Sequence, residues 1–215
     1  MTRSRRTTLL PLLCLLLALG LTACGGDETP VDGVEVESTV EGGEEVGTDL
    51  VTFELPDGWA VLDQETASQK AGSDANPLLG EMADRSGLTP EQLAAQMEAI
   101  ELYAAAPGGA VDGFLTNVNV VEQPMPPGGL PEPEGLRPEL MSFADEVGDI
   151  EVIETGRDLE GLRAEYLVAS GDLEINGEQI LVEVDDQLVI VSISAARAED
   201  AAEIADLVEQ TLGAA

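Results

Sequence analysis

The sequence predicts an α+β fold, in which a mostly antiparallel β-sheet is flanked by helices in an α/β/α sandwich. In the last third of the chain, several segments alternate apolar and polar residues, and turn residues separate these segments. Apolar residues at helical spacing come before and after them. Helices that precede and follow a run of antiparallel strands pack against the faces of the sheet, which is the arrangement of an α+β sandwich.

The chain begins with a segment that is typical of a bacterial export signal. Arginines at positions 3, 5 and 6 precede an apolar run over residues 9–21. This run has about 13 residues, whereas a membrane-spanning helix needs roughly 20. We therefore expect a cleaved signal rather than a permanent membrane span. Both the general secretory route and the twin-arginine route remain open, because the paired arginines match a twin-arginine signal only in part.

A short motif at the end of the apolar run leads to a cysteine. Leu21, Thr22 and Ala23 form a lipobox, in which small residues directly precede the thiol of Cys24. We expect residues 1–23 to be removed and Cys24 to be the site of lipid attachment. Two acyl chains on this residue would hold the protein stably at the cell membrane, on its extracytoplasmic side. The alternative is an ordinary secretory signal, after which Cys24 is a chance residue.

Residues 24–49 are predicted to form a disordered acidic linker. The stretch is rich in glycine and acidic residues, and its large apolar residues are only scattered valines. Such a segment buries too little apolar surface to fold. It would act as a tether that spans on the order of 25–30 Å. The folded domain is then expected over residues 50–215.

The domain is predicted to open with a β-hairpin. Apolar and polar residues alternate over residues 51–55, which is the period of a half-buried strand. A turn is expected at residues 56–58, because proline presets one backbone angle and glycine relaxes the other. The second strand of the hairpin is predicted at residues 59–62. Its first residue, Trp59, is the only tryptophan, and we expect it to fill the core.

Two helices and two strands are predicted in the middle of the chain. Asn76 and Thr89 are each followed by a proline, which indicates a helix start at both positions. Residues 101–106 could extend the second helix or form a strand. We prefer a strand, because a proline and two glycines follow and would turn the chain back. A further strand is expected over residues 114–121.

The last third is predicted to be a helix, an antiparallel meander and a closing helix. The first helix is indicated by helical spacing of Leu136, Leu140, Phe143 and Val147. The strands are expected at residues 150–154, 162–168, 179–184 and 188–194. Turns are expected at Asn176-Gly177 and at residues 185–187. The strand at 188–194 is apolar on both faces, so we expect it to be central. The closing helix begins at about Ala198.

The composition limits the classes of partner that this protein can bind. The chain has 9 basic and 43 acidic residues, a net charge of −34. Removal of the signal leaves six basic residues and a net charge of −37. Nucleic acid is therefore not expected as a partner, because every phosphate would be repelled. The chain has no histidine, and both cysteines lie outside the predicted domain, so neither a disulfide nor a common zinc site is expected.

The layout resembles a known family. The lipobox, the acidic linker, a Phe-x-Leu-Pro-x-Gly-Trp opening from Phe53 to Trp59 and an Asn-Val-Asn-Val strand from Asn117 to Val120 resemble the LpqN-type lipoproteins of actinobacteria. Those proteins belong to the wider PsbP-like (Mog/PsbP) fold. The resemblance covers roughly residues 50–212 and implies a sheet flanked by helices that serves as a binding or scaffolding module. None of its motifs is catalytic.

A search for catalytic chemistry yields no specific site. Acidic pairs occur at Glu132/Glu134, Asp145/Glu146 and Asp185/Asp186. With 43 acidic residues such neighbours are expected by chance, so no catalytic residue, metal site or cofactor is predicted. No phosphate-binding loop or Ser-x-x-Lys motif is present.

Two functions from different classes remain. The first is a membrane-anchored binding or adaptor module of the cell envelope, with an envelope protein or a small-molecule ligand as partner. Its candidate ligand or partner face lies near Asn117 and Asn119, which could also be polar groups on a half-exposed strand face. The second is an envelope hydrolase with a carboxylate-only active site, which needs two carboxyl groups about 5–10 Å apart.

Overall fold

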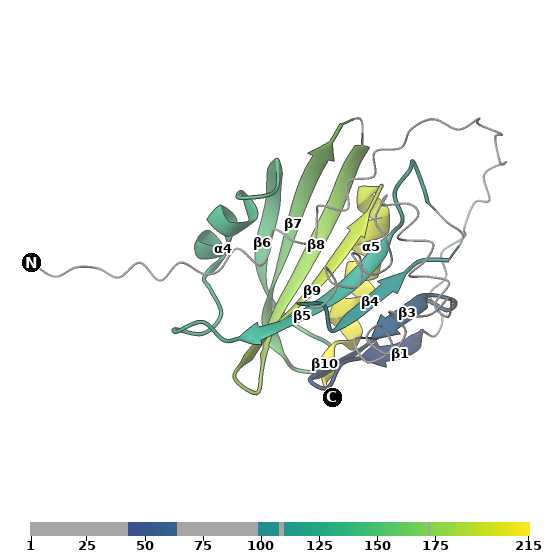
Figure 1. Cartoon of the computed structure of the whole chain (residues 1–215). Helices are drawn as coiled ribbons and strands as arrows, with labels where there is room; N and C mark the ends of the chain where they lie inside the picture. The colour runs from purple at the N-terminus through teal and green to yellow at the C-terminus, as the bar shows by residue number, and fades with distance from the viewer. Residues whose placement is uncertain (1–42, 64–98, 108–109, 172) are drawn as a thin grey trace, which may run out of the picture.

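The computed structural model of the chain describes residues 43–63, 99–107, 110–171 and 173–215 (Figure 1). The lipobox with Cys24 and the helices predicted to begin at Asn76 and Thr89 lie outside the described residues. The described part has the α+β fold that the sequence predicts, with antiparallel strands and two helices.

A seven-stranded antiparallel sheet forms the body of the molecule, in the order β3-β4-β5-β9-β8-β7-β6. Its strands are β3 (Ala60–Asp63), β4 (Leu102–Ala105), β5 (Asn117–Pro124), β6 (Glu146–Glu154), β7 (Glu160–Ser170), β8 (Leu173–Val184) and β9 (Gln187–Ala195). A second, three-stranded sheet has the order β1-β2-β10. Its strands are β1 (Glu44–Gly47), β2 (Val51–Leu55) and β10 (Gly213–Ala214).

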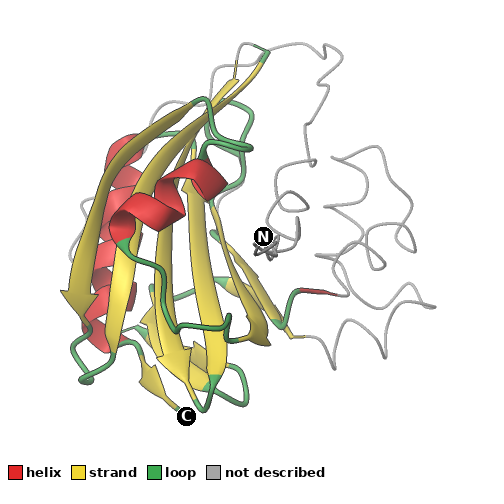
Figure 2. Cartoon of the chain, turned by 90° about the vertical axis from the view of Figure 1, so that its left-hand side faces the viewer, coloured by secondary structure: helices red, strands yellow, loops and turns green. Residues whose placement is uncertain are grey.

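The two helices pack on opposite faces of the large sheet. Helix α5 (Ala198–Thr211) lies along one face and also packs against β2 (Figure 2). Its buried residues share one core with alternate residues of β8 and β9, such as Ile180 and Val191. Helix α4 (Pro133–Leu140) lies beside β6, and its Leu136 and Leu140 join a second core on the other face. The sheet therefore separates two apolar layers.

Strand β9 is central, as its apolar sequence predicts. It lies between β5 and β8, and every residue from Leu188 to Ala195 is buried. A two-residue turn joins it to β8, and Asp185 and Asp186 both have positive φ, at 50° and 61°. This is the geometry of a type I′ turn, whose twist matches that of the flanking strands. The turn predicted here is thus confirmed, with Gln187 as the first residue of β9.

The predicted hairpin at the start of the domain is wrong, although both of its strands exist. Strand β2 pairs with β1 and β10, whereas β3 pairs with β4 in the other sheet. Gly58 makes the expected turn with φ of 84°, but the turn passes the chain from one sheet to the other. The period of a strand reports which side chains are buried and does not report which strand lies beside it.

The boundary between linker and domain also needs correction. Residues 44–47 were assigned to the linker but form β1, whose residues pair with β2 in antiparallel register. The side chain of Arg157 holds this strand in place, because its guanidinium donates to Glu45 at 3.1 Å and to Thr52 at 3.0 Å. Composition misses β1 because its stability comes from a partner strand and not from its own apolar content.

The helix predicted through Leu136, Leu140, Phe143 and Val147 is shorter than expected. It ends at Leu140, and the chain then turns so that Val147 lies in β6. Phe143 reaches the same core from the turn, where its ring packs edge-on against Tyr166 at 5.5 Å between centroids. The helical spacing therefore marks residues that share one core, although only the first two lie on a helix. The other five predicted strands, at residues 101–106, 114–121, 150–154, 162–168 and 179–184, are present as β4, β5, β6, β7 and β8, although β5 begins only at Asn117 and β8 begins earlier, at Leu173.

Asn176 and Gly177 do not form a turn. They lie within β8, opposite β7 on one side and β9 on the other. Gly177 faces the ring of Tyr166, and a Cβ atom at this position would lie 2.1 Å from the ring carbon Cζ. Glycine is needed here because the aromatic ring lies directly across the strand, and not because the backbone turns.

This close approach gives a test. Gly177→Ala is expected to lower the free energy of unfolding by about 1–3 kcal/mol, because the added methyl group must displace the ring of Tyr166. Gly135→Ala in α4 is the matched control, since its nearest contact would be 3.8 Å away and alanine favours a helix. Urea unfolding followed by circular dichroism measures both. Equal stability of Gly177→Ala and the parent would contradict the assigned packing.

Candidate functional site

A strip of polar side chains crosses the middle of the large sheet, on the face opposite α5. We call it the polar strip, and its members are Asn117, Asn119, Tyr166, Gln179, Ser192 and Ser194. The strand registers bring them together: Asn119 lies opposite Ser192, and Ser192 lies opposite Gln179. In the next row Asn117 lies opposite Ser194, whose other neighbour is Gly177. The residues come from β5, β9, β8 and β7, so no local sequence motif contains them.

The first row contains two acceptors that have no partner. Asn119 is 4% exposed and Gln179 is 2% exposed. The side-chain oxygens Oδ1 of Asn119 and Oε1 of Gln179 are buried without a hydrogen bond. Gln179 uses only its amide nitrogen, which donates to Oγ of Ser192 at 3.3 Å. Since buried polar groups are nearly always paired, two orphaned carbonyl oxygens in one row are exceptional.

Tyr166 closes the second row. Its side chain lies over Gly177 and its hydroxyl group forms a hydrogen bond with Ser194. Burial raises the pKa of Tyr166 to about 12 and Glu178 adds to this, while the hydrogen bond with Ser194 acts in the opposite direction. The phenol is therefore protonated at every physiological pH. It provides a neutral hydroxyl group at the end of the polar strip and not a negative charge.

The two asparagines singled out from the sequence occupy different environments. Both lie on the same face of β5, as expected. Asn117 is partly exposed, and its amide nitrogen donates to the backbone oxygen of Leu115 at 2.9 Å, which fixes its orientation locally. Asn119 is buried and not half-exposed, at 4% of its surface. Sequence reasoning missed Gln179, Ser192 and Ser194, although two serines that alternate with Val191 and Ile193 were a usable signal.

The polar strip carries only uncharged polar groups. Its members carry amide and hydroxyl groups, and none of them is ionised at neutral pH. The unpaired groups of Asn119 and Gln179 are acceptors. They can therefore bind hydroxyl or amide N–H groups, whereas a carboxylate or phosphate would meet oxygen atoms of like partial charge.

The unpaired acceptors also predict a stability effect. Gln179→Met with Ser192→Ala is expected to raise the free energy of unfolding by about 1 kcal/mol, because a buried orphan acceptor and its polar neighbour become apolar together. Ser192→Ala alone is the matched control and should lower it by about 1 kcal/mol, since it removes the partner of Gln179. Chemical denaturation of the three proteins is the measurement. A double variant as unstable as the single one would show that the acceptors are satisfied.

The acidic pairs named from the sequence do not form a cleft. Glu132, Glu134, Asp145, Glu146, Asp185 and Asp186 are all exposed. The structure instead groups Glu101 with Glu122 and Asp49, and Thr48 donates a hydrogen bond to Glu122. Burial raises the pKa of Glu101, and the charges of Glu122 and Asp49 raise it further. This is a second, acidic group on the small-sheet side, separate from the polar strip.

One buried ion cluster serves the fold. Arg163 on β7 binds Glu178 on β8 at 2.9 Å, and its guanidinium also reaches Asp206 and Glu209 on α5. Burial by itself lowers the pKa of Arg163, but the three carboxylates together reverse this and raise it. The pKa of Glu178 is raised: burial raises it most and the charges of Glu165 and Asp206 add to this, while the hydrogen bond and the charge of Arg163 act in the opposite direction. The cluster joins α5 to the sheet, and each of its three carboxylates is paired with Arg163.

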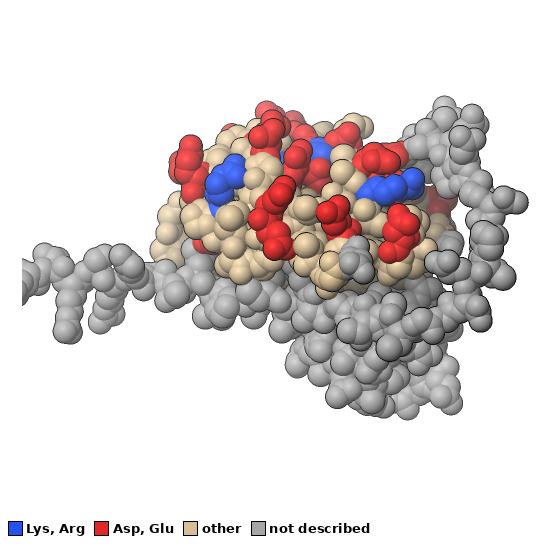
Figure 3. Space-filling model, turned by 90° about the horizontal axis from the view of Figure 1, so that it is seen from above, with Lys and Arg blue, Asp and Glu red and all other residues tan. Residues whose placement is uncertain are grey.

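The described surface is strongly acidic. Figure 3 shows acidic side chains spread over one side of the molecule, with few basic ones among them. Within the described ranges, no three acidic, cysteine or histidine side chains are grouped so that they could hold a metal ion. The same residues include no helix that is long and apolar enough to cross a membrane.

Comparison with known proteins gives structural neighbours only. No family model and no curated protein matches the sequence. The solution structure of cyanobacterial PsbP (CyanoP) from Synechocystis sp. PCC 6803 is similar, with a TM-score of 0.49 and 13% identity, over 86% of this chain and 99% of that one. LpqN of Mycobacterium tuberculosis, involved in cell envelope biogenesis, is similar with a TM-score of 0.43 and 10% identity, over 81% of this chain and 86% of that one.

Proposed function

We propose that this protein is a lipid-anchored binding module of the cell envelope, which holds an uncharged ligand on the polar strip. The observation that carries the proposal is the pair of buried acceptors without partners, Oδ1 of Asn119 and Oε1 of Gln179. Leaving such groups unpaired costs about 1–3 kcal/mol each, and a ligand that donates hydrogen bonds to them would recover this free energy on binding.

The location of the module rests on the sequence. The lipobox at residues 21–23 and Cys24 support an anchor on the extracytoplasmic side of the membrane. The negative net charge of the mature chain would repel anionic lipid headgroups, which supports a position of the domain slightly away from the membrane surface. The linker would supply the length for this separation. The partner in this setting is an uncharged envelope component that presents hydroxyl or amide N–H groups.

The experiment uses small neutral probes and the stable double variant. Glycerol and N-methylacetamide supply the two donor types, and acetate is the charged control. Side-chain amide signals of Asn119 and Gln179 in nuclear magnetic resonance spectra are expected to shift with either neutral probe and not with acetate. Gln179→Met with Ser192→Ala should abolish the response at Asn119. Unchanged amide signals with both neutral probes would exclude the polar strip as a binding site.

The carboxylate hydrolase remains a second candidate because of one observation. Glu101 lies beside Glu122 and Asp49, and burial together with these two charges raises its pKa, which favours the protonated form that a general acid needs. If this group is catalytic, the protein should release nitrophenol from a panel of 4-nitrophenyl glycosides, and Glu101→Gln should stop the release. Absence of turnover across the panel would leave the binding module as the function.

A further inference from the structure

One edge of the large sheet is open over a short segment. Strand β6 is the last strand of the seven, and it pairs with β7 on one side only. Within residues 43–63, 99–107, 110–171 and 173–215, no strand pairs with its other side. None of its nine residues is buried. An edge of this kind presents unpaired backbone N–H and C=O groups to a further strand.

The first half of this edge is closed by the protein itself. The pairing of β6 with β7 shifts register between Val147 and Ile150, which is a β-bulge. The guanidinium of Arg137 on α4 donates to the backbone oxygens of Val147 and Gly148, at 2.9 Å each. Bulges and capped carbonyl groups are known means of preventing a further strand from pairing. The second half, residues 150–154, has neither device.

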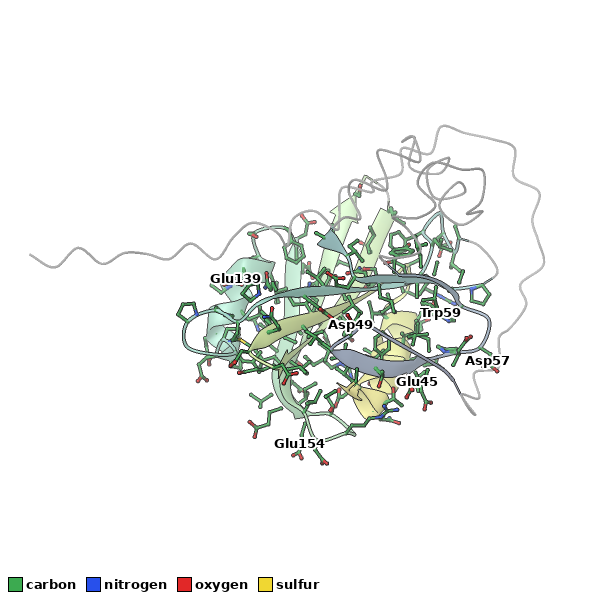
Figure 4. All side chains as sticks on the ribbon, turned by 60° about the horizontal axis from the view of Figure 1, so that its bottom comes forward. Glu45, Asp49, Asp57, Trp59, Glu139 and Glu154 are labelled. Atoms are coloured by element: carbon green, nitrogen blue, oxygen red, sulfur yellow. The ribbon has the colours of Figure 1, made fainter. Side chains whose placement is uncertain are left out.

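The open half carries a defined pattern of side chains. Val152 is 73% exposed, the highest value among the exposed large apolar residues of the described chain. Asp149, Glu151 and Glu154 lie on the same strand and are also exposed. Figure 4 shows Glu154 at the lower end of the molecule, with its side chain directed away from the sheet. The open half thus combines an exposed apolar side chain with two negative charges, and Asp149 adds a third directly before it.

We propose that residues 150–154 of β6 bind an extended polypeptide segment with lysine or arginine residues, by addition of a strand to the sheet. Backbone hydrogen bonds would supply affinity, and the charges would select the partner. Opposite charges on facing residues of paired strands stabilise the pair, and like charges destabilise it. A second copy of this acidic strand is therefore repelled, while a cationic strand is attracted. This proposal is independent of the polar strip.

The test uses a designed peptide. Lys-Val-Val-Lys-Val-Lys, acetylated and amidated and run antiparallel to β6, places lysine opposite each acid and valine opposite each apolar residue. Glu-Val-Val-Glu-Val-Glu is the control peptide. The basic peptide is expected to slow hydrogen exchange at backbone amides of residues 150–154, and the acidic peptide is expected to have no effect.

Two charge-reversal variants separate strand addition from general attraction to an acidic protein. Asp149→Lys with Glu154→Lys should weaken binding of the basic peptide by about tenfold and allow binding of the acidic one. Glu199→Lys with Glu203→Lys on α5 changes the net charge equally at a distant exposed face and should leave binding unchanged. The proposal would be overturned if both double variants lost affinity for the basic peptide equally. It would also be overturned if the basic peptide did not slow hydrogen exchange at residues 150–154.

Discussion

Arg163→Met is expected to lower the free energy of unfolding by about 3–5 kcal/mol, the largest stability effect that we predict for a single residue. The guanidinium of Arg163 holds the carboxylate of Glu178, whose side chain is only 6% exposed. Without it, a buried negative charge is left with no partner. Removing one member of a buried ion pair is costly for this reason, even where the intact pair adds little net stability.

The defect should depend on pH in a definite direction. Burial raises the pKa of Glu178 in the folded protein, and the loss of Arg163 removes a group that lowers it. A carboxyl with a raised folded pKa stabilises the fold below its unfolded pKa, and this contribution is lost as the pH rises through the folded pKa. The difference in the free energy of unfolding between the parent and Arg163→Met should therefore be small below about pH 4 and grow toward neutral pH.

Two further variants test the cause. Arg163→Met combined with Glu178→Leu should recover much of the lost stability, because neither charge is then buried. Arg197→Met removes another arginine that binds a carboxylate, Asp200, but this pair is exposed and the variant should unfold like the parent. Urea unfolding over a range of pH values measures all of them. A deficit that is independent of pH would show that lost packing, and not the buried charge, is responsible.

Cys24→Ser is expected to move nearly all of the protein from the membrane fraction to the soluble fraction. A serine hydroxyl cannot form the proposed thioether to lipid, so the proposed anchor would be lost. Each buried methylene group of an acyl chain contributes about 0.8 kcal/mol to membrane binding, and two chains are needed for stable attachment. The acidic chain has no compensating attraction to anionic lipid.

Cys14→Ser provides the matched control, because this second cysteine lies within the predicted signal and is removed with it. It should remain in the membrane fraction and have the same mature mass as the parent. Fractionation and intact mass spectrometry of the native proteins are the measurements. A parent protein that begins before residue 24, or that carries a free thiol there, would contradict the lipid anchor.

The sequence predicted single elements well where local pattern and tertiary packing agree. The closing helix begins at Ala198 as expected, and its buried residues Ala201, Ile204 and Val208 follow helical spacing. The preference for a strand over residues 101–106 is confirmed by β4. In α5 one face is buried and the other is exposed, so the helical period of the sequence reports it directly, whereas β4 is predicted by the turn residues that follow it.

The candidate site could be predicted only in part. The sequence predicts Asn119 as part of a candidate partner face, but its alignment with Gln179 depends on the register across three strands. Residues that are 60 positions apart in the chain share a row only after the strand order is known. The same holds for Arg163, which no local motif links to Glu209 on α5.

The amino-acid sequence by itself determined the class of fold, the central position of β9, the tight turn at Asp185 and Asp186, and the absence of thiol and imidazole chemistry from the domain. Only the tertiary structure decided that β2 and β3 belong to different sheets and that Gly177 accommodates an aromatic ring. The physical reason is that alternation and turn residues encode the local environment of a segment. Its partners are selected by the free energy of packing the whole chain, which no segment contains.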